Sequence, residues 1–417
     1  MEHEGKKYLY YTSHSDRTCL EDIGLAMTED NMHYEKLGRP VLSPDPKYYI
    51  SRPEELNVYV HASPRCVDCR DMCVVKDPKG NGWWGYFAAR VFSESAVETS
   101  VIGLAHSDDL IHWTQLPPCF APKKFACIEV PDVYEMDGKW WMTVLTGNGY
   151  GQRNRMDDPY MTCGTICAVA DSPEGPFVLP EESTVMGSCT MQGNAVKSLM
   201  FEGERYLFWT QVEKGAPLGS VSLPSKAEVR RGHIVPCWNR WLDTLIGGER
   251  LDMLTEAPIE NTGRWGTVAS WEQKEDGIYA MAERDWSVRM YERTEKDFVA
   301  EACVIIGDAR SVGFVFHAPG ERASEKGYVF LLDVEKQETQ LVWLYNFQMV
   351  ERRRWKIDRN RELEMKLIVL GRNIYLYLDG ELVHQLNDDQ FEEGKFGLMV
   401  EAGGAVFTQA KVYEVNG

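Results

Sequence analysis

Short apolar runs alternate with turn residues along the whole chain. In the first half, four such runs read EGKKYLYY (4–11), GNGWWGYFAAR (80–90), DGKWWMTVL (137–145) and EGERYLFWTQ (202–211). Each begins at a turn that contains Gly and continues with the aromatic and branched residues that strands favour. The pattern predicts a protein built from β-strands, in which one type of strand recurs.

A sequence repeat follows these strands. IGLAMTEDNMHYEKL (23–37) and IGLAHSDDLIHWTQL (102–116) align without a gap, and ICAVADSPEGPFVLP (166–180) is a weaker third copy. The Asp residues within the first two copies predict tight turns between strands. Long repeats rich in short strands are typical of β-propellers, in which each unit forms a four-stranded blade. A β-sandwich with similar hairpins is the alternative.

The repeat ends near residue 237, but strands continue after about residue 278. Among them are GYVFLLDV (327–334) and NIYLYLDGELVHQL (373–386), and the second contains a strong Asp-Gly turn signal. Strands with hairpin turns and no propeller signature predict an all-β sandwich. We therefore expect an all-β chain with a β-propeller over 1–237, a connecting segment over 238–277 and a β-sandwich over 278–417.

Composition narrows the class of ligand. The 417 residues suffice for two domains, and the net charge of −19 disfavours both nucleic acid and anionic membranes. No run approaches the roughly 20 apolar residues of a membrane span, and the first residues lack the pattern of a signal peptide. A small neutral carbohydrate fits better, and the 13 Trp and 19 Tyr residues suit a sugar site as well as a β-rich core.

The eleven cysteines show no disulfide framework. Scattered cysteines predict reduced thiols and a cytoplasmic location. Cys66, Cys69 and Cys73 make up half of a zinc pattern, but no second pair follows at the usual spacing. We therefore expect no metal and no cofactor.

Two carboxylates stand where strands of consecutive repeats begin. Asp71 follows Arg70 ahead of CVVKD, and Glu129 precedes Pro131 ahead of DVYEMDG. The inner strands of propeller blades open at a common axis, so these acids are expected to converge in one cavity. A pair of carboxylates can cleave a glycosidic bond. The alternative is that each acid accepts backbone hydrogen bonds in a turn.

These stretches resemble motifs of glycoside hydrolase family 32, the β-fructofuranosidases. Arg70-Asp71 is similar to the Arg-Asp-Pro motif of the family, and IEVPDVYEMDGKW (128–140) is similar to its Glu-Cys-Pro-Asp motif. LGSVSLPSKAEV (218–229) resembles the segment that closes the last blade in the family. The chain departs from the pattern at Met72, where Pro is expected, and at Val130, where Cys is common.

The resemblance implies roles for three residues. Glu129 would be the general acid/base that protonates the leaving oxygen, Asp71 the stabiliser that holds fructose hydroxyls, and Arg70 a substrate-binding residue. The resemblance also implies a five-bladed propeller, a following sandwich, and retaining hydrolysis of β-fructofuranosides such as sucrose or fructans. An acid catalyst must keep its proton near neutral pH, which an enclosed pocket with a second carboxylate favours.

The nucleophile of the family is not found in the sequence. The family carries it in a Trp-Met-Asn-Asp-Pro-like motif of the first blade, and a retaining enzyme needs it about 5–5.5 Å from the acid. Asp45 and Asp158 each precede Pro and are interpreted as turn residues. Four blades are visible where the family has five. We therefore expect the chain to open inside the second blade. Four explanations stay open: a homo-oligomer or a second chain completes the ring, residues 238–277 fold back as a substitute blade, the chain is a truncated product, or the propeller closes on four blades and has lost hydrolysis.

Three functions stay open at this stage. The chain hydrolyses β-fructofuranosides, binds sugars without hydrolysing them, or acts on related furanosides such as arabinofuranosides. The missing nucleophile motif favours the second function, for which weak sugar binding with little or no hydrolysis is expected.

Overall fold

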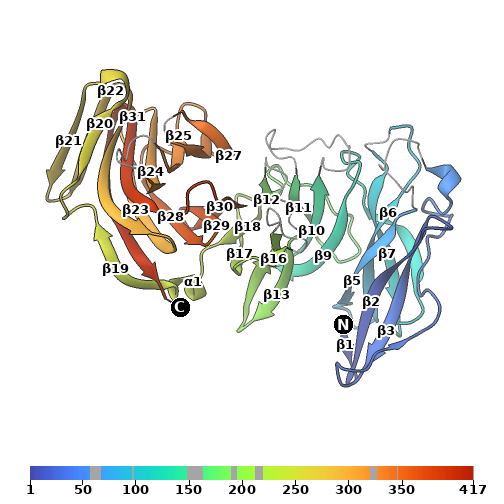
Figure 1. Ribbon diagram of the computed structural model, residues 1–417. Coiled ribbons are helices and arrows are strands. Elements are labelled where there is room, and N and C mark those ends of the chain that lie inside the picture. Colours follow the sequence, from blue (N-terminus) through green and yellow to red (C-terminus); the bar gives the residue numbers. More distant parts are fainter. Residues whose placement is uncertain are drawn as a thin grey trace.

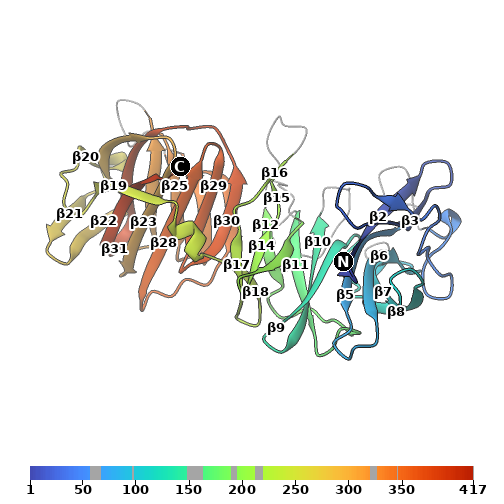
Figure 2. The same cartoon turned by 90° about the horizontal axis from the view of Figure 1, so that it is seen from below.

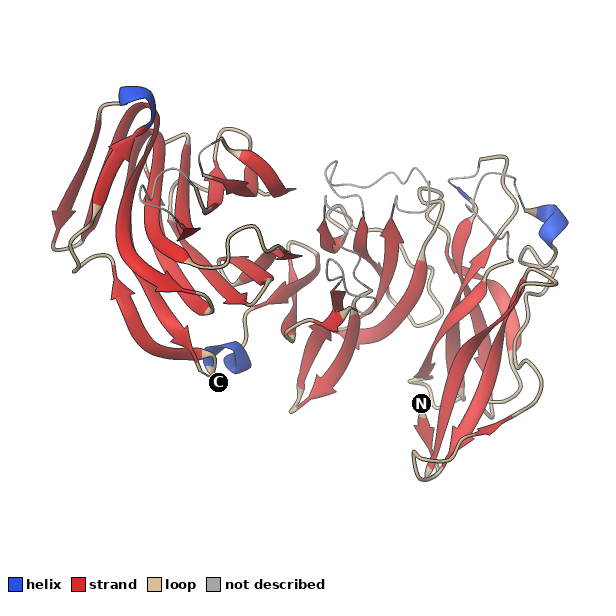
Figure 3. Ribbon diagram, in the orientation of Figure 1, coloured by secondary structure: helices blue, strands red, loops and turns tan. Residues whose placement is uncertain are grey.

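The computed structural model describes residues 1–56, 67–95, 98–147, 163–188, 195–211, 219–319, 326–344 and 346–416. Its regular structure is almost entirely β-strand (Figure 3). A row of sheets begins at the N-terminus and ends against a large sandwich (Figure 1), and the second view shows the same succession (Figure 2). The predicted all-β architecture, a β-propeller followed by a β-sandwich, is confirmed.

Within the described residues, the propeller part contains three antiparallel four-stranded sheets in succession, followed by a fourth group of four strands, called the fourth sheet below, which continues into the strands of the sandwich. The first has β1 (Glu2–His3), β2 (Lys6–Ser15), β3 (Leu20–Thr28) and β4 (Glu35–Lys36); the second has β5 (Cys69–Lys76), β6 (Trp83–Arg90), β7 (Ser100–Ser107) and β8 (Thr114–Phe120). The third has β9 (Glu129–Met136), β10 (Lys139–Gly147), β11 (Cys163–Ala170) and β12 (Thr184–Ser188); the fourth has β13 (Lys197–Phe201), β14 (Glu204–Phe208), β17 (Ser225–Arg230) and β18 (His233–Cys237). A short pair, β15 (Thr210–Gln211) and β16 (Ser220–Val221), and the 3-10 helix η1 (Pro53–Glu55) complete this part.

The repeated sequence builds the same turn twice. Asp109 accepts hydrogen bonds through Oδ1 from the backbone N–H groups of Ile111 (2.9 Å) and His112 (2.7 Å), and its Oδ2 lies 2.6 Å from the His112 ring. Asp30, at the matching position of the first copy, makes the corresponding three contacts at 2.8, 2.8 and 2.7 Å. The Asp turns inferred from the repeat therefore join the third and fourth strands of the first two sheets.

Each sheet packs against the next through apolar side chains. Along β6, Tyr86 belongs to the core shared with the third sheet, whereas the next residue, Phe87, belongs to the core shared with the first. This change of side follows from the two-residue period of a strand. A further core joins the third and fourth sheets to the sandwich and contains Trp141, Trp209 and Tyr377.

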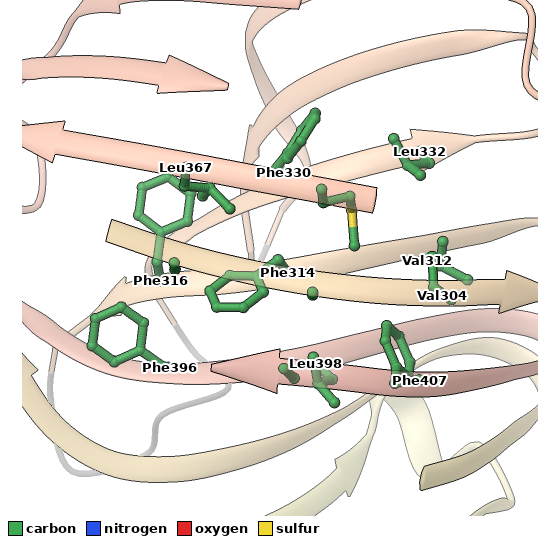
Figure 4. Close-up of a cluster of buried hydrophobic side chains, with 14 of the residues drawn as sticks. Val304, Val312, Phe314, Phe316, Phe330, Leu332, Leu367, Phe396, Leu398 and Phe407 are labelled. Atoms are coloured by element: carbon green, nitrogen blue, oxygen red, sulfur yellow. The ribbon is translucent and has the colours of Figure 1, made fainter. Parts of the chain in front are cut away.

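The sandwich is built mainly from long antiparallel strands. They are β22 (Gly277–Glu295), β23 (Phe298–Ile306), β24 (Ser311–Ala318), β25 (Tyr328–Asp333), β26 (Glu338–Trp343), β27 (Gln348–Arg354), β28 (Glu362–Leu370), β29 (Asn373–Leu378), β30 (Glu381–Asn387) and β31 (Gly394–Val415). Phe314, Phe316, Phe330, Phe396 and Phe407 gather in the core between these strands (Figure 4). A second buried cluster of the sandwich contains Trp286, Val315 and Val342, so the aromatic and branched residues of the second half fill more than one apolar layer.

Residues 238–277 differ from the predicted connecting segment. They contain α1 (Arg240–Asp243), β19 (Ile246–Asp252), β20 (Glu260–Gly263), the 3-10 helix η3 (Arg264–Gly266) and β21 (Ala269–Lys274). β19 pairs with β31, and β20 and β21 both pair with β22, so this segment belongs to the sandwich. All the residues of β31 that pair with β19 lie more than a hundred positions away along the chain, so a local sequence pattern gives no sign of that pairing.

Two further findings concern the predictions on membrane spans and on the half zinc pattern. Within the described ranges, no helix is long and apolar enough to cross a membrane. Of the cysteines in the half zinc pattern, Cys66 lies outside the described residues, and Cys69 is buried with a free thiol.

The repeated turn yields a stability prediction. Asp109→Ala removes the acceptor for two backbone N–H groups, so it is expected to lower the free energy of unfolding by about 1–2 kcal/mol. Asp108→Ala is the control, because the Asp108 side chain is 90% exposed and only an N···O contact of 3.8 Å to His106 is lost. Urea unfolding of the two variants measures the difference. Equal effects of the two substitutions would contradict the assigned role of the turn.

Candidate active site

The proposed acids lie on the edge strands of neighbouring sheets. β5 is the edge strand of the second sheet and β9 that of the third, and the two strands contact each other. The pairing of β5 with β6 shifts register between Arg70 and Cys73, and the pairing of β9 with β10 shifts where β9 begins. Both irregularities are β-bulges, which turn side chains away from the regular alternation.

A left-handed residue stands at the centre of each bulge. Asp71 has φ +59° and Val130 has φ +54°. Asp tolerates this conformation, but a β-branched residue adopts it rarely and at a cost. Strained backbone of this kind is concentrated at functional sites, where the surrounding packing enforces it.

Hydrogen bonds connect the two bulges to each other and to the first sheet. The Asp71 carboxylate accepts a bond from the Val130 N–H (3.2 Å), and the Asp71 N–H donates to Thr12 Oγ1 (3.2 Å). Thr12 belongs to β2. Asp71 therefore fixes the relative positions of three sheets as well as supplying a carboxylate.

Arg70 brings the two predicted acids together. It donates from Nε (3.0 Å) and Nη2 (2.8 Å) to Glu129 Oε2, and its Nε lies 3.5 Å from Asp71 Oδ2. Since the two distances from Nε add to 6.5 Å, these oxygens of Asp71 and Glu129 are no farther apart than that. The Asp71 side chain is 25% exposed and that of Glu129 is 15% exposed, so both are partly open to solvent.

Two further carboxylates contact Arg70 and were missed in the sequence. Arg70 Nη1 lies 3.0 Å from Glu21 Oε2, on β3, and 2.8 Å from Asp68 Oδ1. Asp68 is almost completely buried and also contacts Arg90 Nε at 2.6 Å. The charged run before IGLAM contains Glu21, but nothing in that run indicates a partner 49 positions away.

The cluster carries more negative than positive side chains. Four carboxylates (Glu21, Asp68, Asp71 and Glu129) surround two guanidinium groups (Arg70 and Arg90). Burial raises the pKa of Asp71, and the charge of Glu129 adds to that effect, while Arg70 opposes it. Asp71 is therefore a carboxyl group that binds a proton more readily than a free aspartate.

The fourth sheet supports the strand that carries Glu129. Lys197 Nζ donates to the Pro131 carbonyl (2.8 Å), and the Asp132 carboxylate accepts bonds from the Ser198 N–H (2.9 Å) and hydroxyl (2.7 Å). These contacts connect β13 to the beginning of β9. The position of Glu129 therefore depends on three neighbouring sheets.

Asp45, a further candidate from the sequence, does not join this cluster. Asp45 accepts a bond from the Lys47 N–H (2.9 Å), as expected of a turn residue, and Asp158 lies outside the described residues. In the part of the chain that the structure describes, no group of three or more His, Cys, Asp or Glu side chains is arranged to hold a metal ion.

The sequence of the chain is only distantly similar to known proteins. No family model matches it. The curated levanase of Bacillus subtilis strain 168 is 26% identical over an alignment of 179 positions, which covers 39% of this chain and 26% of the levanase. The chain thus aligns with about a quarter of the length of that relative.

Solved structures match the chain over nearly its whole length. A family 32 β-fructofuranosidase of Bombyx mori superposes with a TM-score of 0.63 at 15% identity, covering 100% of this chain and 78% of that one. Sucrose-6-phosphate hydrolase of Lactobacillus gasseri gives 0.67 at 13% identity (100% and 77%), and exo-inulinase of Aspergillus awamori gives 0.65 at 12% identity (99% and 80%). At such identities the similarity concerns the fold, and in its fold this chain is glycoside hydrolase family 32-like.

Proposed function

We propose that the protein is a glycoside hydrolase that acts on β-fructofuranosides such as sucrose or fructans. The observation that carries the proposal is the placement of Asp71 and Glu129 on one guanidinium group, at bulges of adjacent edge strands. Their separation of at most 6.5 Å suits a pair of carboxylates that act on one glycosidic bond. The names of the structural neighbours support this class of substrate.

In this proposal the two acids have different tasks. Arg70 occupies Oε2 of Glu129, and Oε1 has no hydrogen-bond partner among the described residues. Oε1 is therefore the atom from which a proton would pass to the leaving oxygen of the sugar. Asp71 would accept hydrogen bonds from fructose hydroxyls and stabilise the positive charge that develops on the ring.

Arg70 has a second role in the proposal besides substrate binding. Its donors are directed to Glu21, Asp68 and Glu129, so it positions carboxylates before any sugar arrives. A sugar hydroxyl that reaches Arg70 would have to share these donors. We retain Arg70 as a substrate-binding residue and add this positioning role.

Two alternatives to this proposal stay open, and a sequence observation favours the first. The sequence lacks the nucleophile motif of family 32, which favours a protein that binds sugars without cleaving them. A related furanosidase that acts on arabinofuranosides would use the same acids. The retaining mechanism, the completing chain and the cytoplasmic location stay predictions.

The raised pKa of Asp71 yields a stability prediction with a definite sign. A carboxyl group whose pKa is higher in the folded state stabilises the protein fully below its unfolded value and loses that contribution as the pH rises. Asp71→Asn is therefore expected to raise the free energy of unfolding at about pH 7, because burial then acts on a neutral amide. The gain should vanish below the ordinary value of 3.8. Urea unfolding at several pH values tests this, and a variant less stable than the wild type at neutral pH would contradict it.

Glu129→Gln tests the proposed acid. The amide keeps the shape of the side chain and can still accept the bonds from Arg70, but it cannot deliver a proton. We expect kcat for fructose release to fall by a factor of about 100 to 10,000, and Asp71→Asn to lower it as well. The matched control is Glu135→Gln, an exposed glutamate on the same strand, which should leave kcat unchanged.

Assays with sucrose, inulin, levan and an arabinofuranoside separate the alternatives. Fructose release at roughly 1 s⁻¹ or more supports a hydrolase, and for a retaining mechanism it requires that another carboxylate supplies the nucleophile. Sugar binding without release supports the non-catalytic alternative. Activity of Glu129→Gln equal to that of the wild type would remove Glu129 from the mechanism.

A further inference from the structure

A second polar site lies where the propeller meets the sandwich. A cavity of about 550 Å³ is lined by the residues before β12, the turn between β17 and β18, the end of β27 with the residues that follow it, and the turn between β29 and β30. No residue of the Arg70 cluster lines it. Its volume is within the range of sites that bind small molecules.

The wall of this cavity is unusually basic for the chain. Six of its residues are Arg or Lys and four are Asp or Glu, whereas the whole chain has a net charge of −19. The acids are largely paired already. Arg231 donates to both oxygens of Glu381 (2.8 and 3.0 Å) and to Glu182 (3.0 Å), and Arg361 donates to Asp379. Arg230, a further cation of the wall, pairs with Glu228 (2.8 Å) outside the cavity lining. The side chains that bear on an added anion are therefore Arg353 and Lys356.

Arg353 is the most informative of these side chains. It is 8% exposed, and among the described residues it forms no ion pair. Its Nη2 donates to the Thr184 carbonyl (3.2 Å), while the buried Nη1 has no hydrogen-bond partner. A buried charge without a counter-ion is unfavourable, and a guanidinium group is suited to binding an oxyanion.

His233 is a second buried side chain on the wall, and one of its ring nitrogens lacks a hydrogen-bond partner among the described residues. It is 1% exposed, and its Nδ1 has no such partner and lies 3.6 Å from a Glu182 oxygen. Burial, together with Arg353 and Arg231, lowers the pKa of His233 to about 4. The His233 ring is therefore neutral near pH 7. It adds no charge to the cavity, but its Nδ1 can form a hydrogen bond with a bound ligand.

Lys356 and Trp355 lie next to Arg353 in sequence and line the same cavity. Lys356 is exposed, and no described residue pairs with it. The Trp355 ring lies under the guanidinium groups of Arg231 (4.8 Å from the ring centroid) and Arg353 (5.8 Å), which holds both cations at the cavity wall. The site thus combines a buried cation, Arg353, with an exposed cation, Lys356.

We propose that this cavity binds a small molecule that carries an oxyanion, either a phosphate monoester or a carboxylate. Arg353 and His233 would hold the anionic group inside, and Lys356 would attract it from solvent. The volume exceeds what a free ion needs, so the oxyanion belongs to a larger body such as a sugar ring. This site is separate from the proposed catalytic cluster and does not depend on it.

Calorimetric titration of the full chain tests the proposal with four ligands. Glucose 6-phosphate and glucuronate share a ring with glucose and add one oxyanion each, and inorganic phosphate supplies the anion alone. We expect the wild type to bind at least one of the two anionic sugars at least tenfold more tightly than glucose. Binding of one alone identifies phosphate or carboxylate as the preferred group, and inorganic phosphate should bind more weakly than the preferred anionic sugar.

Three variants connect the binding to this cavity. Lys356→Gln should weaken binding of the anionic sugar several-fold without affecting the fold, because the side chain is exposed, and Arg353→Gln should weaken it at least tenfold. Lys139→Gln is the control, since this lysine is on β10 and does not line the cavity. The melting temperature of each variant is measured alongside, so that loss of the fold is not taken for loss of the site.

Two results would overturn the proposal. The first is that the wild type binds neither anionic sugar more tightly than glucose. The second is that Lys356→Gln and a folded Arg353→Gln bind as tightly as the wild type. Glu129→Gln should bind the anionic sugars like the wild type, so failure of the proposed hydrolase function leaves this test intact.

Discussion

The arrangement of the propeller sheets around the acids depends on one side chain, Arg70. Its guanidinium group is 12% exposed and is held between Glu21 of the first sheet, Asp68 and Asp71 of the second, and Glu129 of the third. Leaving such a group without a partner costs about 3–5 kcal/mol. The ion pairs that surround this charge therefore hold three sheets in fixed positions. They also set the distance between Asp71 and Glu129, the proposed catalytic pair.

The two β-bulges bring the side chains of Asp71 and Glu129 to the same place between the sheets. In a regular strand, alternation would direct neighbouring side chains to opposite faces. Left-handed backbone at Asp71 and Val130 breaks the alternation at corresponding places of two sheets, and the hydrogen bond between these residues fixes one bulge against the other. Backbone strain at Val130 is thus maintained by packing on both sides, as is common where function requires a particular geometry.

The sandwich is joined to the propeller by a core as well as by the chain. Trp209 of the fourth sheet donates to Gln385 of β30 (3.1 Å), and Tyr377 belongs to the core that both parts share. The ion pair between Arg231 and Glu381 crosses the same boundary. Charged side chains surround the apolar core at this boundary, and some of their polar atoms have no hydrogen-bond partner among the described residues. The basic cavity around Arg353 lies at this boundary.

The sequence by itself determined the strands, the turns formed by Asp30 and Asp109, and the candidate acids Asp71 and Glu129. These features depend on alternation and on side chains that bond to backbone a few positions away, so they are visible in short stretches. Only the tertiary structure decided that Glu21 and Asp68 join the acids, and that residues 238–277 complete the sandwich. Those contacts join segments tens to more than a hundred positions apart, and no local pattern specifies which distant segment a strand or a charge will meet.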